Sequence, residues 1–227
     1  MSIPDWVRPV AEYMIEEGLR NTLQIALISL VCSSVIGVTL GTLLTIRFLP
    51  TRALIRLYIE VWRGLPILVT IFIVFFALPA MSSELDFSAI TSASIALTLW
   101  GSAQVAEATR GAVQSIPREQ HEAASALGFG WVGRHVFVIM PQALRRLLPP
   151  VVGLLVNIIQ NTTIAQVIGA PELLETGERQ VERLAFPPPS GIGELHAFEI
   201  YGAVMVVFFL ISFPLTRLAA YLERRLV

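Results

Sequence analysis

Glu122-Ala123-Ala124-Ser125-Ala126-Leu127-Gly128 is the stretch around which this chain is organised. It lies in a polar, arginine-containing island between strongly apolar segments. Pro117 suits the first turn of a helix, because a proline there loses no needed hydrogen bond. Gly128 and Gly130 offer the left-handed backbone that ends a helix. The stretch therefore predicts a short helix with an alanine surface that another protein could approach closely.

A second short helix is expected directly after this one, over residues 131–140, with Pro141 halting it. Alanine-rich helices are common, so an ordinary amphipathic surface helix explains the alanines as well as a docking surface does. The remainder of the chain has to decide between the two interpretations.

The composition points to a membrane protein. The 227 residues are 55% hydrophobic and only 15% charged, whereas a soluble domain carries about 25% charged residues. The apolar residues gather in five uncharged runs, each near the roughly 20 residues that a membrane-spanning helix needs. The runs are 24–46, 64–83, 87–106, 147–171 and 200–216. We therefore predict an all-α membrane protein with five transmembrane helices.

The charges predict the orientation. There is no lysine, so arginine supplies every fixed positive charge. Arginines concentrate in 47–56, 110–146 and 217–225, which fall on one side if five spans alternate, while glutamates dominate the other side. The positive-inside rule then places the N-terminus outside and the C-terminus, with the Glu122 stretch, in the cytoplasm.

Several chemistries are not supported by the sequence. A phosphate-binding P-loop needs a lysine, so the chain is not expected to hydrolyse ATP itself. His121-Glu122 is followed by Ser125 where a zinc motif needs a second histidine, so no metal site is expected. The few aspartates lie outside the spans, so no catalytic triad is expected. We also predict no cofactor on this chain, no nucleic-acid partner and no cleaved signal peptide.

Charged and polar residues in or beside the spans are the candidates for function. Glu60 and Arg63 are three residues apart and can face one another on a helix, and Gly64 and Pro66 loosen the backbone that follows. Glu107 can pair in the same way with Arg110, which competes with a role in transport.

The fourth run carries amides and hydroxyls over residues 157–166. Such a cluster costs several kcal/mol in lipid unless it is partnered. It is therefore expected to face a watery pathway or, alternatively, the packing between subunits. The chain onward from Leu174 to Ala197 is acidic and is expected to form an external loop, stiffened by Pro187-Pro188-Pro189. Its glutamates are expected to be solvated, although the loop is also long enough to meet an external protein.

The Glu122 stretch, followed by Val138-Ile139-Met140-Pro141, resembles the EAA loop of the inner-membrane permease subunits of bacterial ABC importers. Val138 and Met140 stand where that pattern usually has isoleucine and leucine. The run from Tyr58 to Pro66 is similar to the polar amino-acid branch (His/Glu/Gln/Arg/opine) of these permeases, as is Ala106-Glu107-Ala108-Thr109-Arg110-Gly111. Relatives usually have lysine-aspartate-threonine-serine where Gln160-Asn161-Thr162-Thr163 stand, so neutral amides replace both charges here.

The resemblance implies a type I ABC importer permease fold and a non-enzymatic transport subunit of the bacterial inner membrane. In that family the loop forms a coupling helix that docks on the ATPase, which implies docking by Glu122, Ala123, Ala124 and Gly128. Gln104, Glu107, Asn161 and Thr162 are the candidates for lining the substrate pathway.

The implied partners are a pair of ATPase subunits, which bind ATP and magnesium, and a second permease subunit, identical or sister. An extracytoplasmic amino-acid-binding protein, the amino acid itself and membrane lipid complete the set.

The expected organisation is an external amphipathic segment at 1–18, a permease domain at 19–222 with its coupling loop at about 114–146, and a cytoplasmic tail at 223–227. Two other classes of function remain open. An ion-gradient-driven secondary transporter would need no ATPase and should contain internal repeats. A membrane scaffold without transport would leave the 157–166 cluster with no pathway to line.

Overall fold

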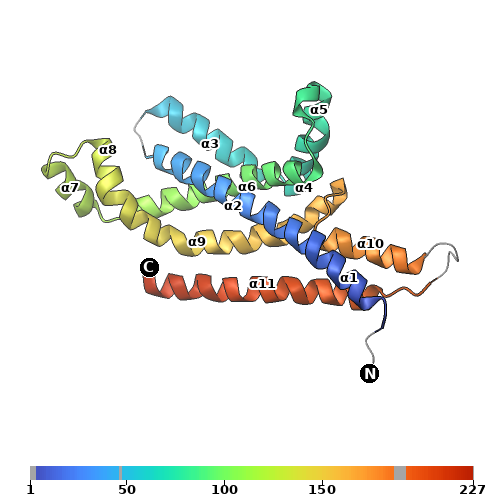
Figure 1. Cartoon of the computed structure of the whole chain (residues 1–227). Helices are drawn as coiled ribbons and strands as arrows, with labels where there is room; N and C mark the ends of the chain where they lie inside the picture. The colour runs from blue at the N-terminus through green and yellow to red at the C-terminus, as the bar shows by residue number, and fades with distance from the viewer. Residues whose placement is uncertain (1–3, 46–47, 187–192, 227) are drawn as a thin grey trace. The chain divides into compact units, whose positions relative to one another are not determined.

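The computed structural model describes residues 4–45, 48–186 and 193–226, and within these ranges it consists of helices joined by turns and irregular segments, with no strand (Figure 1). Arg47 and the triple proline at 187–189 lie outside the described residues, as do the ends of the 1–18 and 223–227 segments. The all-α prediction is confirmed for the part of the chain that is described.

The helices follow one another with short connections. Three segments are π-helical (η1, η2, η4) and two are 3₁₀-helical (η3, η5). In chain order the elements are α1 (Val7–Tyr13), η1 (Met14–Leu19), α2 (Arg20–Leu43), α3 (Leu49–Gly64), α4 (Ile67–Phe72), η2 (Ile73–Ala77), α5 (Leu78–Met81), η3 (Ser83–Leu85), α6 (Ala89–Gln114), α7 (Arg118–Ala126), α8 (Trp131–Arg134), η4 (His135–Ile139), α9 (Met140–Asn161), η5 (Thr162–Ile168), α10 (Leu173–Ala185) and α11 (Ala197–Leu226).

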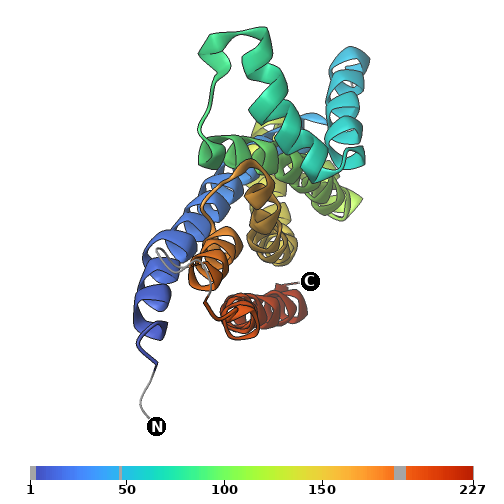
Figure 2. The same cartoon turned by 90° about the vertical axis from the view of Figure 1, so that its right-hand side faces the viewer.

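These elements form two compact units. The first unit comprises 1–29, 66–97 and 157–214, and the second comprises 30–65, 98–156 and 215–227. In the first unit α10 lies beside η1 (Figures 1 and 2), and the two share an apolar core that includes Met14, Leu173 and Ile200. In the second unit Ile139 and Leu147 pack against the end of α6.

Length and hydropathy admit three helical segments as membrane spans in the described part of the chain, namely Val7–Leu43, Trp131–Ile168 and Ala197–Leu226. A fourth is admitted if the broken pair Leu49–Gly64 and Ile67–Met81 counts as one span. These cover four of the five runs expected from the sequence. The remaining run coincides with α6, a helix of 26 residues that carries several serines and threonines and is not among those admitted. Its crossing of the membrane stays a prediction.

The break between α3 and α4 lies where Gly64 and Pro66 predicted a bend. Leu65 and Pro66 have extended backbones, with ψ of 136° at both residues. Proline cannot continue the hydrogen-bond ladder and also pushes the preceding residue out of the helical region. The local sequence is therefore sufficient to explain this break.

The expectation that Pro141 halts the helix is wrong. The chain is helical from Trp131 through α9, past Pro141 and the adjacent Pro149 and Pro150. The π-helical turn η4 comes immediately before Pro141, and such turns absorb an irregularity in the hydrogen-bond ladder. The side-chain amide of Gln142 donates to the carbonyl of Val138 (2.9 Å) in the same turn. The helix that contains α9 consequently starts at Trp131, well before the uncharged run at 147–171 from which it was predicted.

Two glycines let α2 approach α6 closely in the second unit. A Cβ on Gly37 would lie 2.4 Å from Cβ of Val105, and one on Gly41 would lie 2.4 Å from the carbonyl oxygen of Ala106. Ser33 Oγ donates across the same interface to the carbonyl of Thr98 (3.2 Å). Small residues of this kind allow backbone-to-backbone packing between membrane helices. Ser33, Gly37 and Gly41 are therefore the positions through which α2 packs on α6.

Adding a methyl group at Gly41 is expected to force α2 and α6 apart. We expect Gly41→Ala to lower the free energy of unfolding by about 1–3 kcal/mol, the usual cost of overpacking. Gly153→Ala is the matched control, because no atom lies within 4 Å of its added Cβ in α9 and alanine is the better helix former. Thermal unfolding of the detergent-solubilised protein measures both, and equal midpoints would contradict the packing role.

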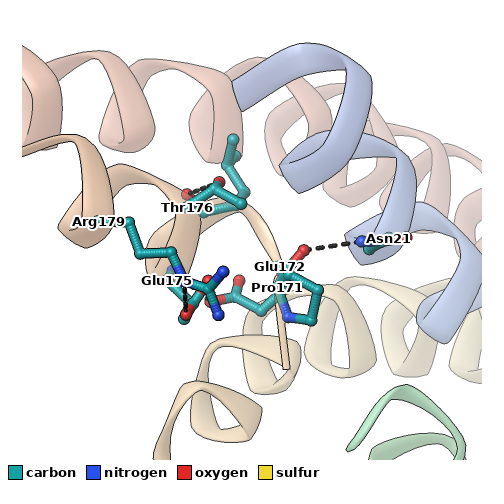
Figure 3. A network of polar contacts seen from close by, with 7 residues as sticks. Asn21, Pro171, Glu172, Glu175, Thr176 and Arg179 are labelled. Carbon is teal, nitrogen blue, oxygen red and sulfur yellow. Dashed lines mark hydrogen bonds and ion pairs between the residues drawn. The ribbon is translucent and has the colours of Figure 1, made fainter. Parts of the chain in front are cut away.

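The acidic segment after Pro171 is a helix and not a loop, and two of its glutamates are buried. Glu172 is 0% exposed and caps α10, accepting hydrogen bonds from the backbone N–H groups of Leu174 (3.0 Å) and Glu175 (2.8 Å). Glu175 is also buried and pairs with Arg179 (Figure 3). The expectation of solvated glutamates after Leu174 is therefore wrong at Glu175. The fold covers them because α10 packs against η1 and the start of α2.

Side chains from the start of α2 tie down the same segment. Asn21 Nδ2 donates to the carbonyl of Pro171 (2.9 Å; Figure 3), and Thr22 Oγ1 accepts from the backbone N–H of Leu173 (3.0 Å). Burial raises the pKa of Glu172 from its ordinary 4.5 to about 7, opposed by the backbone N–H groups of the cap. The Glu172 carboxyl thus exchanges its proton near neutral pH.

The contribution of Glu172 to stability should fall as the pH rises. The folded pKa lies above the ordinary value, so this contribution is complete below about pH 4.5 and is lost through about pH 7. The total change attributable to this one group is about 3 kcal/mol. Unfolding midpoints between pH 5 and 8.5 should show the loss in the wild type and a flatter profile in Glu172→Gln. Glu178→Gln, at an exposed position on the same helix, should leave the wild-type profile unchanged.

Candidate functional site

The predicted docking stretch forms α7, a nine-residue helix. Pro117 precedes it as the N-cap, with an extended ψ of 143°, so the proline lies one position before the expected first turn. Arg118 Nε donates to Glu122 Oε1 (2.8 Å) in an exposed pair along the helix. An exposed pair of this spacing stabilises the helix by only about 0.3–0.5 kcal/mol. The Glu122 side chain therefore stays available for a stronger partner.

Gly128 ends α7 in the left-handed conformation that the sequence predicted, with φ of 83°. The N–H of Gly128 donates to the carbonyl of Ser125 (3.0 Å), and the N–H of Phe129 donates to the carbonyl of Ala124 (3.1 Å). This pair of hydrogen bonds is a Schellman motif, which requires positive φ at the glycine. Gly130 has φ of −65° and caps the start of α8, so the expectation of left-handed backbone there is wrong.

The alanines divide between the two faces of α7. Ala124 is 2% exposed and faces the unit interior, whereas Ala123 and Ala126 are exposed. The exposed face therefore presents Glu122 together with nearly side-chain-free backbone. This is the surface predicted for the approach of another protein.

α8 and η4 support α7 from one side. Arg134 Nη1 donates to Ser125 Oγ (2.8 Å), and that hydroxyl in turn donates to the carbonyl of His121 (2.8 Å). Burial lowers the pKa of His121, with a further contribution from the positive charge of Arg134, so its imidazole is neutral at pH 7. Sequence reasoning missed the part played by Arg134 and Ser125, because residues nine positions apart meet only through the turn at Gly128.

Two of the predicted pathway residues, Gln104 and Glu107, lie three positions apart on α6, and both are partly buried. Glu107 forms a two-pronged ion pair with Arg110, whose Nε donates to Glu107 Oε2 (3.0 Å). Arg110 also donates to Gln114 (2.6 Å). The Glu107–Arg110 pair anticipated from spacing is therefore confirmed.

Glu107 and Arg110 open on a charged cleft of about 230 Å³ in the second unit, which Arg56, Glu60 and Arg63 also line. Among the described residues Glu60 and Arg63 form no ion pair with each other, although their spacing would allow one. The cleft instead gathers three arginines and two carboxylates from α3 and α6.

The other two pathway candidates lie at the junction of α9 and η5, in the first unit. Asn161 Nδ2 donates to the carbonyl of Asn157 (2.7 Å), and Thr162 Oγ1 donates to the carbonyl of Ile159 (2.8 Å). Thr162 is 0% exposed, while Asn161 is partly exposed. These polar groups satisfy their own backbone, as side chains at a change from α to 3₁₀ geometry commonly do.

No group of three or more histidine, cysteine, aspartate or glutamate side chains that could hold a metal ion occurs within the described ranges. The candidate site thus comprises the exposed face of α7 with Glu122, and polar side chains on α6 and at the end of α9. None of these groups is arranged as a nucleophile with its base.

Comparisons with known proteins agree with these features. The family described as "Binding-protein-dependent transport system inner membrane component" matches residues 22–227. The probable glutamine ABC transporter permease protein GlnP of Bacillus subtilis is 34% identical over 210 residues, which is 92% of each chain. The glutamine transport system permease protein GlnP of Escherichia coli K12 is 34% identical over 224 residues, or 98% of this chain and 97% of that protein.

Solved structures give the fold. A chain of an amino acid ABC transporter crystallised with histidines superimposes with a TM-score of 0.81 at 25% identity, covering 99% of this chain and all of that one. The MetNI methionine ABC transporter in an inward-facing conformation reaches a TM-score of 0.77 at 16% identity, covering 99% of this chain, and bears on the fold alone. The fold is that of a type I ABC importer permease, and the chain belongs to the family of binding-protein-dependent transport system inner membrane components.

Proposed function

We propose that this chain is the permease subunit of an ATP-driven ABC importer that carries polar amino acids across the bacterial inner membrane. The similarity to glutamine permeases over almost the whole of both chains supports this function. The single structural observation that carries it is the exposed, left-handed end of α7 at Gly128, which presents Glu122 and two alanines for docking.

In this proposal α7 transmits force from a separate ATPase. Glu122, Ala123 and Gly128 meet the ATPase surface, and Ala124 anchors the helix in its own unit, because its side chain is buried. The pair of ATPase subunits binds ATP and magnesium and carries out hydrolysis. The Arg134–Ser125 hydrogen bond joins α7 to the helix that continues into α9, so a push on α7 reaches a membrane span.

The proposed assembly contains a second permease subunit, identical or sister, and an extracytoplasmic amino-acid-binding protein. The N-terminus lies outside and the C-terminus in the cytoplasm, as the arginine distribution favours. The boundaries at 18/19 and 222/223 belong to the same proposal.

Gln104, Glu107, Asn161 and Thr162 are proposed to line the substrate pathway. Thr162 is buried in its own unit, so it reaches the pathway only if η5 moves during transport. Asn161 is partly exposed, so it is better placed than Thr162 to contact a substrate. Its neutral amide favours a substrate held by hydrogen bonds over one held by an ion pair.

Co-purification and uptake together test the function. The chain, isolated from its native membrane, should carry an ATPase partner, and proteoliposomes of that complex should accumulate glutamine when ATP is supplied. Uptake driven by an ion gradient without ATP would point to a secondary transporter. A stable assembly with neither activity would point to a scaffold. Either result would overturn the proposal.

Replacing Gly128 by valine is expected to abolish coupling. A β-branched residue at φ of 83° strains the backbone by at least about 1–2 kcal/mol, which would unwind the end of α7. We expect a loss of both glutamine uptake and permease-stimulated ATP hydrolysis, with unchanged membrane insertion.

Gly130→Val is the matched control, because Gly130 has a negative φ and open space around its Cβ position. It should retain most of the uptake. If the Gly128 variant also transported normally, docking through this end of α7 would be refuted.

A further inference from the structure

A second cleft in the same unit, of about 780 Å³, has no role in the function proposed above. We name it the Arg52–Arg134 cleft. It lies between the end of α2, the start of α3, the end of α6, and α7 with α8. Its polar lining includes Thr45, Arg52, Gln114, His121, Trp131 and Arg134. It therefore adjoins the docking helix without including Glu122 or Gly128.

The charge of this cleft is one-sided. Two arginines line it, and none of the described residues in its lining is an aspartate or a glutamate. No ion pair of Arg52 occurs within the described ranges, and the neutral hydroxyl of Ser125 is the recorded partner of Arg134. The charged cleft at Glu107 differs in this respect, since two carboxylates there offset the arginines. Two fixed positive charges in the Arg52–Arg134 cleft thus have no counter-charge among the lining residues that the structure describes.

Two N–H donors in the lining also lack an acceptor. The indole Nε1 of Trp131 and the Nε of Arg134 are both buried, and neither has a hydrogen-bond partner among the described residues. A buried donor without a partner costs about 1–3 kcal/mol, and a bound ion or water is one of the explanations for such a group in a native protein. Both donors lie on α8, a single turn apart.

His135 holds the indole of Trp131 in place beside the cleft. His135 Nδ1 lies 2.8 Å from the carbonyl of Trp131, so this nitrogen donates, and its Nε2 lies 3.1 Å from Thr45 Oγ1. The imidazole also packs on the indole of Trp131, with ring centroids 4.1 Å apart. The indole is therefore fixed by contacts with its neighbours and does not depend on the cleft being filled.

We propose that the Arg52–Arg134 cleft binds a phosphate or phosphate-ester group. Orthophosphate or a phosphate monoester carries a charge of about −1.5 to −2 at neutral pH, which matches two arginines, whereas a carboxylate or a phosphodiester would neutralise only one. Its oxygens accept hydrogen bonds from several directions, and guanidinium groups suit that geometry. The bound group would connect α3, α7 and α8, so its occupancy would set the position of the docking helix. The phosphate can come from a free phosphate compound or from the headgroup of an anionic lipid.

Binding is tested on the purified full chain in nanodiscs of phosphatidylcholine, by equilibrium dialysis with radiolabelled orthophosphate at constant ionic strength. We expect Arg52→Gln and Arg134→Gln each to weaken binding by about tenfold or more, since each removes a charge-assisted hydrogen bond. Trp131→Phe, which keeps an aromatic ring but removes the N–H, should weaken it less. Arg145→Gln is the control, because Arg145 is exposed on α9 outside the cleft.

The second arm uses nanodiscs that contain phosphatidic acid, with native mass spectrometry to count retained lipid. Lipid retained by the wild type, lost in the two cleft variants, and competing with orthophosphate would identify the headgroup as the source. Orthophosphate binding that is unaffected by the lipid would identify a free phosphate compound.

If Arg145→Gln lost as much orthophosphate binding as the two cleft variants, the binding would reflect general electrostatic attraction and the proposal would be overturned. Cleft variants that bind both probes as well as the wild type but lose the ATPase partner would also overturn the proposal. These measurements need neither ATP nor uptake, so their failure is distinct from a failure of the transport function.

Discussion

The close approach of α2 to α6 is the constraint on which much of the second unit depends. Gly37 and Gly41 remove the side chains that would otherwise separate the two backbones. Membrane helices gain little from apolar burial against lipid, so van der Waals packing between backbones and hydrogen bonds such as Ser33 to Thr98 take over that role. Because α6 leads into α7 through three residues, the packing of α2 on α6 also positions the start of α7.

Irregular helix geometry recurs at the places where function is proposed. The π turn at His135 precedes Pro141, the 3₁₀ segment η5 begins beside Asn161, and α3 breaks from α4 just after the charged cleft. In each case a backbone group loses its helical partner and a nearby side chain or turn compensates. Such segments change conformation more readily than a straight helix. This matches a protein that is expected to move a substrate.

The interior of the first unit contains a buried acidic side chain, Glu172. Glu172 serves as a helix cap between two residues that α2 hydrogen-bonds, Pro171 and Leu173, and its buried carboxyl group has a pKa raised to about 7. The capping hydrogen bonds compensate for part of the desolvation, and the proton compensates for the rest. The Arg52–Arg134 cleft in the second unit is the reverse case, since none of the described residues offers its positive charges a counter-charge or its unpaired donors an acceptor.

The sequence alone determined the features that depend on neighbouring residues. The helical class, the break at Gly64 and Pro66, the left-handed end at Gly128 and the Glu107–Arg110 pair all follow from dihedral preferences or from spacing along one helix. Only the tertiary structure decided that the helix continues past Pro141, that Glu172 and Glu175 are buried, and that Arg52 and Arg134 share a cleft. These outcomes depend on packing between segments far apart in the chain, about which local pattern carries no information.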